Sequence, residues 1–136
     1  MAKLLGIDYG KQRTGIAETD DMQIIASGLT TVKTAEIWQF FEEYLKQNKV
    51  EKIIVGESLD LSGNPNPIEK DITKFIKKFQ KKYPYIEVLR EDERYTSKIA
   101  LDSMIKGGVK KQKRRNKALI DQVSAALILQ GFLYRG

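Results

Sequence analysis

The spacing of hydrophobic and polar positions changes several times along the chain, and each change marks a predicted element. Three short apolar or β-branched stretches come first, at residues 4–9, 14–19 and 22–32. Their close spacing predicts an antiparallel meander of strands. Apolar residues then recur at helical spacing from Thr34, a candidate N-cap, to Gln47, which predicts an amphipathic helix.

The remainder of the chain alternates predicted strands with predicted helices. A short continuous apolar run predicts a strand at 52–56, and a fifth strand is predicted at 86–89. Helices are predicted from Ile68 to before Pro84, at 96–105 and at 118–133. Residues 58–67 are rich in Ser, Gly, Asn and Pro and predict a loop. The pattern predicts an α/β fold, a mixed five-stranded sheet with helices on both faces, in one domain spanning residues 1–136.

Two absences from the composition narrow the chemistry. The chain contains no Cys and no His. The absence of Cys excludes disulfides and thiolate zinc sites. The absence of His excludes Ser-His-Asp triads and His general bases. Any bound metal should be a hard cation held by oxygen atoms, with Mg²⁺ or Mn²⁺ as first choice.

No apolar run is long enough to cross a bilayer, and the start of the chain is too short an apolar stretch for a signal peptide. These features predict a cytoplasmic protein without membrane contact.

Positive charge is concentrated in one segment. The net charge is +6, and seven cations with no acid lie between Lys106 and Lys117, so that the rest of the chain carries −1. A local patch of this kind suits phosphate binding, although a solvated charge run is the simpler interpretation. The predicted nucleic-acid contacts in this segment are Lys110, Lys111, Lys113, Arg114, Arg115 and Lys117.

Several acids fall where α/β sheets bind ligands, at the carboxyl ends of predicted strands. Asp8 ends the first strand, Glu57 the fourth, and Asp92 and Glu93 follow the fifth. Each also has a simpler interpretation as a turn-forming or solvated residue.

Asp121 interrupts a predicted helix that is apolar almost all round, on a face shared with Ser124, Ala125 and Ile128. Small neighbours would let this helix approach the sheet, so that the Asp121 carboxylate could reach the strand ends. Magnesium would offset the repulsion within such a cluster, and two ions roughly 3.5–4 Å apart can hydrolyse a phosphodiester.

An ordered set of short motifs resembles the YqgF/RuvX family. The motifs are Gly6-Ile7-Asp8-Tyr9-Gly10 with Arg13, Gly15-Ile16-Ala17, Ile54-Val55-Gly56, Asp92-Glu93-Arg94-Tyr95-Thr96-Ser97, and Ile120-Asp121-Gln122-Val123-Ser124-Ala125-Ala126 with Ile128-Leu129-Gln130. The resemblance runs from residue 3 to residue 133. It implies a ribonuclease H-like fold related to Holliday-junction resolvases, and a bacterial cytoplasmic nuclease that matures the 5′ end of precursor 16S rRNA.

The resemblance also assigns roles to residues of this chain. Asp8, Glu93 (or its neighbour Asp92) and Asp121 resemble the family's metal-binding catalytic acids. The predicted phosphate contacts of the motifs are Lys11, Arg13 and Arg94. One departure is Ser58, which stands where the family often has proline, and the acid beside it, Glu57, is a candidate additional metal ligand.

Three other functions are compatible with the sequence. The nuclease could act on branched DNA as a Holliday-junction resolvase, or the chain could be a non-catalytic nucleic-acid-binding module of the same fold. The third function is that of a nucleotide-dependent phosphotransferase, because the stretch from Asp8 to Gly15 resembles the phosphate loop of actin-like and sugar-kinase folds. Those folds need two domains that close on ATP, and 136 residues supply only one. The sequence is compatible with a monomer or a homodimer.

Overall fold

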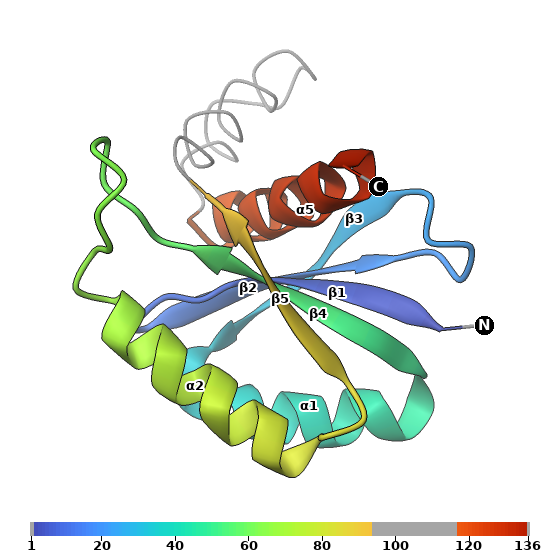
Figure 1. Cartoon of the computed structure of the whole chain (residues 1–136). Helices are drawn as coiled ribbons and strands as arrows, with labels where there is room; N and C mark the ends of the chain where they lie inside the picture. The colour runs from blue at the N-terminus through green and yellow to red at the C-terminus, as the bar shows by residue number, and fades with distance from the viewer. Residues whose placement is uncertain (1, 94–116, 136) are drawn as a thin grey trace.

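The computed structural model describes residues 2–93 and 117–135. These residues form one five-stranded mixed sheet, in the order β3-β2-β1-β4-β5, with helices on both of its faces. Helices α1 and α2 cover one face and α5 covers the other (Figure 1). The predicted α/β architecture is therefore confirmed.

The elements follow one another in nearly the predicted order. They are β1 Lys3–Asp8, β2 Arg13–Thr19, β3 Ala26–Lys33, the 3₁₀ helix η1 Thr34–Glu36, α1 Ile37–Gln47, β4 Val50–Glu57, α2 Glu69–Lys82, β5 Glu87–Asp92 and α5 Lys117–Arg135. The predicted helix at 96–105 lies outside the described residues. No helix within residues 2–93 or 117–135 combines the length and hydropathy needed to cross a bilayer.

The strand directions bring three acids to one end of the sheet. β1 runs antiparallel to β2 and parallel to β4, and β4 runs parallel to β5. The last residues of β1, β4 and β5 are Asp8, Glu57 and Asp92. We call this end, where the three parallel strands finish, the carboxyl end of the sheet.

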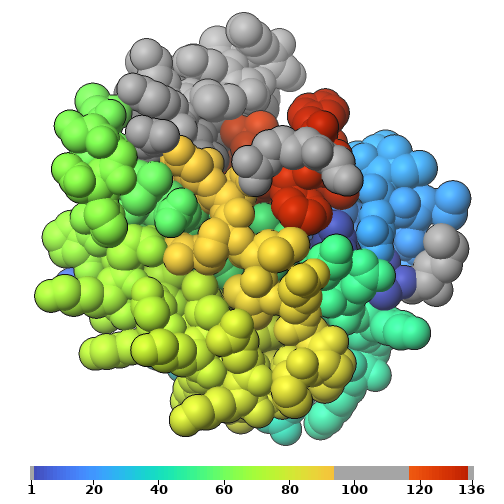
Figure 2. All heavy atoms as spheres, in the orientation of Figure 1, coloured from blue at the N-terminus to red at the C-terminus, as the bar shows by residue number. Residues whose placement is uncertain are grey.

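Two apolar cores lie on opposite faces of the sheet. The larger one, beneath α1 and α2, is built around Phe41, Phe75 and Phe79. The smaller one, beneath α5, joins Leu4 and Ile54 to small and branched residues of that helix. In the space-filling view, β5 (yellow to orange) lies between α2 and α5 (Figure 2).

Glycines of the sheet let α5 approach closely. A Cβ atom at Gly6 would meet the Ala125 carbonyl oxygen at 2.6 Å and the Leu129 Cβ at 2.8 Å, and one at Gly15 would overlap the Asp121 carbonyl oxygen. The predicted close approach of this helix is present. The space for it comes from glycines in the strands as well as from the small Ala125.

The predicted third strand at 22–32 began too early. The Asp20 carboxylate accepts hydrogen bonds from the backbone N–H groups of Met22, Ile24 and Ile25. These donors are used in a turn and cannot join a strand ladder. β3 therefore begins at Ala26.

Thr34 does not cap a helix as predicted. It is the first residue of η1, and its hydroxyl donates to the Gly10 carbonyl oxygen at 2.6 Å. The Thr34 backbone N–H also donates to the Gln12 carbonyl oxygen at 2.9 Å. Thr34 thus fixes the turn that follows Asp8.

Candidate active site

Side chains alternate between the two faces of a sheet, and this alternation determines which acids meet. In β1, Gly6 lies beneath Ala125 of α5, so Asp8, two residues later, is directed to the same face. In β5, Leu89 packs in the core beneath α5, and Glu93 follows with the same parity. The carboxyl groups of Asp8 and Glu93 form a hydrogen bond on this face.

The contact between the two acids changes their charge state. Burial and the neighbouring Glu93 carboxyl raise the pKa of Asp8 well above its ordinary value, with a further contribution from Asp121. Burial also raises the pKa of Glu93, although hydrogen bonds from Asp8 and Ser58 oppose this. When Asp8 is protonated, its carboxyl donates to the Glu93 carboxylate. The pair is poised to bind either a proton or a cation.

Asp121 reaches the same region from α5. Its backbone lies against Gly15 of β2, and its carboxylate accepts a hydrogen bond from Arg13 Nε at 2.8 Å. The carboxylate is close enough to Asp8 to raise the pKa of that group. Asp121 is thus part of the acidic cluster, with its charge balanced by the Arg13 guanidinium.

Glu57 and Asp92 belong to the opposite side of the sheet. Gly56 faces Glu93 and Ile128 on the α5 side, so the next residue, Glu57, is directed away from them. Asp92 precedes Glu93, pairs with Glu57 in the strand register and is exposed. The structure brings Asp8, Glu93 and Asp121 together and leaves Glu57 and Asp92 apart from them.

An ion pair behind Glu93 was missed by the sequence analysis. Arg90 Nη2 donates to the Glu69 carboxylate at 2.8 Å and to the Gly56 carbonyl oxygen at 2.9 Å. Glu69 also accepts the Ser58 backbone N–H at 2.8 Å. This network joins α2, the end of β4 and the end of β5. The sequence contains no clear signal for this ion pair, because Arg90 falls just past the strand predicted at 86–89.

Ser58 gives the loop after β4 a different anchorage from proline. A proline at this position would lack the N–H that binds Glu69. The Ser58 hydroxyl and carbonyl oxygen both accept hydrogen bonds from Asn66, at 3.1 and 3.0 Å. The loop is therefore held at both ends, and its anchorage does not depend on a proline ring.

Three of the predicted phosphate-binding residues, Lys11, Arg13 and Lys117, lie within the described residues. Lys11 is exposed in the turn after β1, and Lys117 is exposed at the first position of α5. Arg13 is engaged with Asp121. The remaining predicted cations, Arg94, Lys110, Lys111, Lys113, Arg114 and Arg115, lie outside the described residues.

The donor set suits a hard cation, because it consists of carboxylate oxygens. Within residues 2–93 and 117–135, no group of three or more acidic side chains is already arranged to hold one metal ion. The Asp121 carboxylate is paired with the Arg13 guanidinium at 2.8 Å. Asp8 and Glu93 are the two acids in direct contact.

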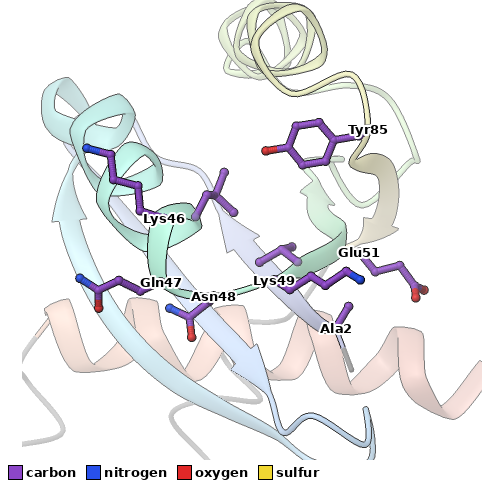
Figure 3. Close-up of a pocket in the computed structure, with 9 residues that line it drawn as sticks. Ala2, Lys46, Gln47, Asn48, Lys49, Glu51 and Tyr85 are labelled. Atoms are coloured by element: carbon purple, nitrogen blue, oxygen red, sulfur yellow. The ribbon is translucent and has the colours of Figure 1, made fainter.

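A hollow of about 720 Å³ lies far from these acids. It is formed by the turn between α1 and β4 together with Ala2 and Tyr85 (Figure 3). Since β1 and β4 begin here, the hollow is at the opposite end of the sheet from Asp8. It is not part of the acidic site.

The sheet order and the helices on its two faces are those of a ribonuclease H-like fold. The chain is similar in structure to Thermus thermophilus RuvC in complex with a Holliday junction substrate, with a TM-score of 0.56, 18% identity, and coverage of 99% of this chain and 96% of that chain. A second Thermus thermophilus RuvC structure gives a TM-score of 0.51 at 16% identity, covering 98% of this chain and 95% of that one. The predicted fold class is confirmed.

The chain belongs to the RuvX family, described as Holliday junction resolvase, which it matches over residues 2–135. It is 52% identical to a Christiangramia forsetii protein over 98% of this chain and 99% of that protein. It is 47% identical to a Flavobacterium psychrophilum protein over 99% of this chain and 98% of that protein. Both relatives carry the name "Putative pre-16S rRNA nuclease". The family predicted from the motifs is confirmed.

Proposed function

We propose that this chain is a metal-dependent endonuclease that hydrolyses phosphodiester bonds in structured RNA, at the 5′ end of precursor 16S rRNA in the bacterial cytoplasm. The observation that carries the proposal is the contact between the carboxyl groups of Asp8 and Glu93, with Asp121 nearby. Family membership and the names of the relatives support the same activity.

Asp8, Glu93 and Asp121 are the residues that would hold Mg²⁺ or Mn²⁺. Such an ion, when bound, activates a water and stabilises the leaving oxygen of a phosphodiester. The chain prepares the site by keeping Asp8 and Glu93 together in a partly buried position. The hydrogen bond from Ser58 orients the Glu93 carboxylate.

Arg13 has two roles in the proposed cycle. Its guanidinium donates to the Asp121 carboxylate at 2.8 Å and balances the charge of that group. If Asp121 were to bind the ion, the guanidinium would be free to donate to a phosphate oxygen of the substrate. Lys11, exposed in the turn just before Arg13, adds positive charge near the acidic cluster.

Branched DNA is the second candidate substrate. The family description and the RuvC complex with a Holliday junction both favour it. Relatives at 52% and 47% identity over almost the whole chain are named for precursor rRNA, and this closer similarity favours RNA.

The direct test is cleavage by the wild-type protein and Asp8→Asn, each with Mg²⁺ and with Mn²⁺. One substrate is a 16S precursor RNA fragment that includes the 5′ leader, and the other is a four-way DNA junction. We expect the wild type to cleave the RNA at the mature 5′ end, and Asp8→Asn to lose at least about 100-fold in rate.

Asp60→Asn, in the loop after β4, is the matched control and should keep the wild-type rate. Cleavage of the junction alone would replace RNA with branched DNA as the substrate. Cleavage that survives Asp8→Asn would refute the proposed site. Binding without cleavage in either metal would favour a non-catalytic module.

A further inference from the structure

A groove lies on the face of the sheet opposite the acids, immediately beyond Asp8. It has a volume of about 220 Å³. Its walls come from the residue after β1, from η1 and α1, and from α2, and include Tyr9, Thr34, Trp38, Lys74, Phe75 and Lys78. Ile37 and Asp71 complete its wall, and we call this site the aromatic groove.

The aromatic side chains of the groove form a continuous platform. The Phe75 ring is buried, and its centroid lies 5.2 Å from that of Tyr9 and 5.4 Å from that of Trp38. Tyr9 and Trp38 are both partly exposed. Phe75 thus supports two partly exposed rings, and the Lys78 ammonium group lies over one of them, Trp38.

Positive charge surrounds this platform. Lys78 Nζ lies 4.8 Å from the centroid of the Trp38 ring, and Lys82 Nζ lies 6.0 Å from it. Six lysines occur in α2, at positions 70, 74, 77, 78, 81 and 82, against two acids. Of these acids, Glu69 is paired with Arg90, whereas Asp71 lies in the groove wall on the first turn of α2.

Asp71 gives the groove two chemically different parts. Burial and the Asp71 charge raise the pKa of Tyr9, so its phenol remains a hydrogen-bond donor at neutral pH. The lysines of the wall, Lys74 and Lys78, come later in α2 and are exposed. The phosphate of a nucleotide would therefore contact the lysines, and its uncharged base would fit against the aromatic rings.

We propose that the aromatic groove binds an unpaired nucleotide of the substrate strand, with its base against Tyr9 and Trp38 and a phosphate at Lys74 and Lys78. This inference rests on the proposed function, because it takes the substrate to be nucleic acid. It adds a binding site on the face of the sheet away from the acids, and a requirement that the strand beside the cleaved bond be single-stranded.

The position of the groove supports this ligand. Tyr9 follows Asp8 directly, so one strand can pass over the carboxyl end of the sheet and contact both faces. The turn between them is fixed by the hydrogen bond from Thr34 to Gly10. Aromatic rings beside exposed lysines match the stacking surface and phosphate contacts of single-stranded nucleic-acid sites, where stacking contributes about 1–3 kcal/mol per base.

Trp38 is the only tryptophan in the chain, so its fluorescence reports on this groove alone. The wild-type protein is titrated with a short single-stranded RNA in EDTA, which prevents cleavage. We expect saturable quenching of Trp38 fluorescence by the single strand, and much weaker quenching by the same RNA as a perfect duplex.

Two double variants separate a local site from general charge attraction. Lys74→Gln with Lys78→Gln removes the groove lysines, and Lys77→Gln with Lys81→Gln removes the same charge from the same helix outside the groove. We expect the first pair to raise the Kd about fivefold or more, and the second to raise it less than about twofold. Kd values are compared rather than amplitudes, because Lys78 itself lies over the Trp38 ring.

Absence of quenching, or equal weakening by both pairs, would overturn the proposed groove. These results are independent of cleavage. Quenching without any nuclease activity would refute the proposed function and leave the groove in place. Cleavage by a protein whose two double variants bind RNA equally would refute the groove alone.

Discussion

The pKa values of Asp8 and Glu93 are both raised in the folded protein, so the stability of the protein should depend on pH. In the unfolded chain both carboxyls titrate near their ordinary values, about 4. In the folded chain, burial raises both pKa values, and the neighbouring carboxyls raise that of Asp8 further. The folded state therefore binds these protons more tightly. This stabilising contribution is complete below the unfolded values and is lost as the pH rises through the folded values.

Asp8→Asn should remove much of this dependence. The asparagine amide can still donate to Glu93, but it carries no charge at any pH. We expect the melting temperature of the variant, measured in EDTA, to rise relative to the wild type between pH 4 and pH 8. Each unit of pKa shift corresponds to about 1.4 kcal/mol. A difference in melting temperature between the variant and the wild type that stays constant from pH 4 to pH 8 would contradict the raised pKa of Asp8.

Arg13→Gln should strengthen binding of Mn²⁺ in the absence of nucleic acid. The guanidinium competes with the metal for Asp121, and its removal leaves that carboxylate available. Calorimetry should show a Kd lower by several-fold, while Lys11→Gln, in the same turn, should change it little. An unchanged Kd in Arg13→Gln would show that Asp121 does not bind the ion.

The sequence indicated the acidic positions but could not choose among them. Glu93, Asp92 and Glu57 all follow apolar strands, and they differ only in which face of the sheet their side chains occupy. That depends on the register between β4 and β5, which pairs Glu57 with Asp92. Periodicity within one strand does not contain this information.

At the scale of elements, α5 depends on glycines in the strands beneath it. Gly6→Ala would place a methyl group against the Ala125 backbone and the Leu129 side chain. We expect a loss of about 1–3 kcal/mol in the free energy of unfolding, measured by urea denaturation.

Gly131→Ala is the matched control within α5. Its added methyl group would meet the end of the Glu91 side chain at 3.1 Å, which can move aside. Because alanine favours the helix, this variant should be neutral or more stable by up to about 1 kcal/mol. Equal losses in both variants would mean that the close approach at Gly6 has no special importance.

Most elements could be predicted because their apolar spacing is regular. The errors arose where a side chain bonds the backbone. Asp20 delays the start of β3, and the Thr34 hydroxyl binds Gly10 instead of capping a helix. Neither bond has a signature that distinguishes it from an ordinary turn or cap in the sequence.

At the scale of the whole molecule, the two sides of the sheet have different chemistry. Helix α5 covers one face of the sheet, and α1 and α2 cover the other (Figure 1). The acids lie on the α5 side, and the aromatic groove and the lysines of α2 lie on the side of α1 and α2. The sequence pattern points to Lys106–Lys117 rather than to α2, because the lysines of α2 have the spacing of any solvated helix face. Their significance depends on Tyr9 and Trp38, which only the fold brings beside them.

The central claim is that the catalytic acids are those whose side chains lie on the α5 face of the sheet. The most direct measurement is the single-turnover rate of RNA cleavage by Glu93→Gln and by Asp92→Asn, adjacent residues that each lose one carboxylate. We predict that Glu93→Gln loses at least about 100-fold while Asp92→Asn stays within a few-fold of the wild type. Equal losses, or a larger loss for Asp92→Asn, would contradict the account.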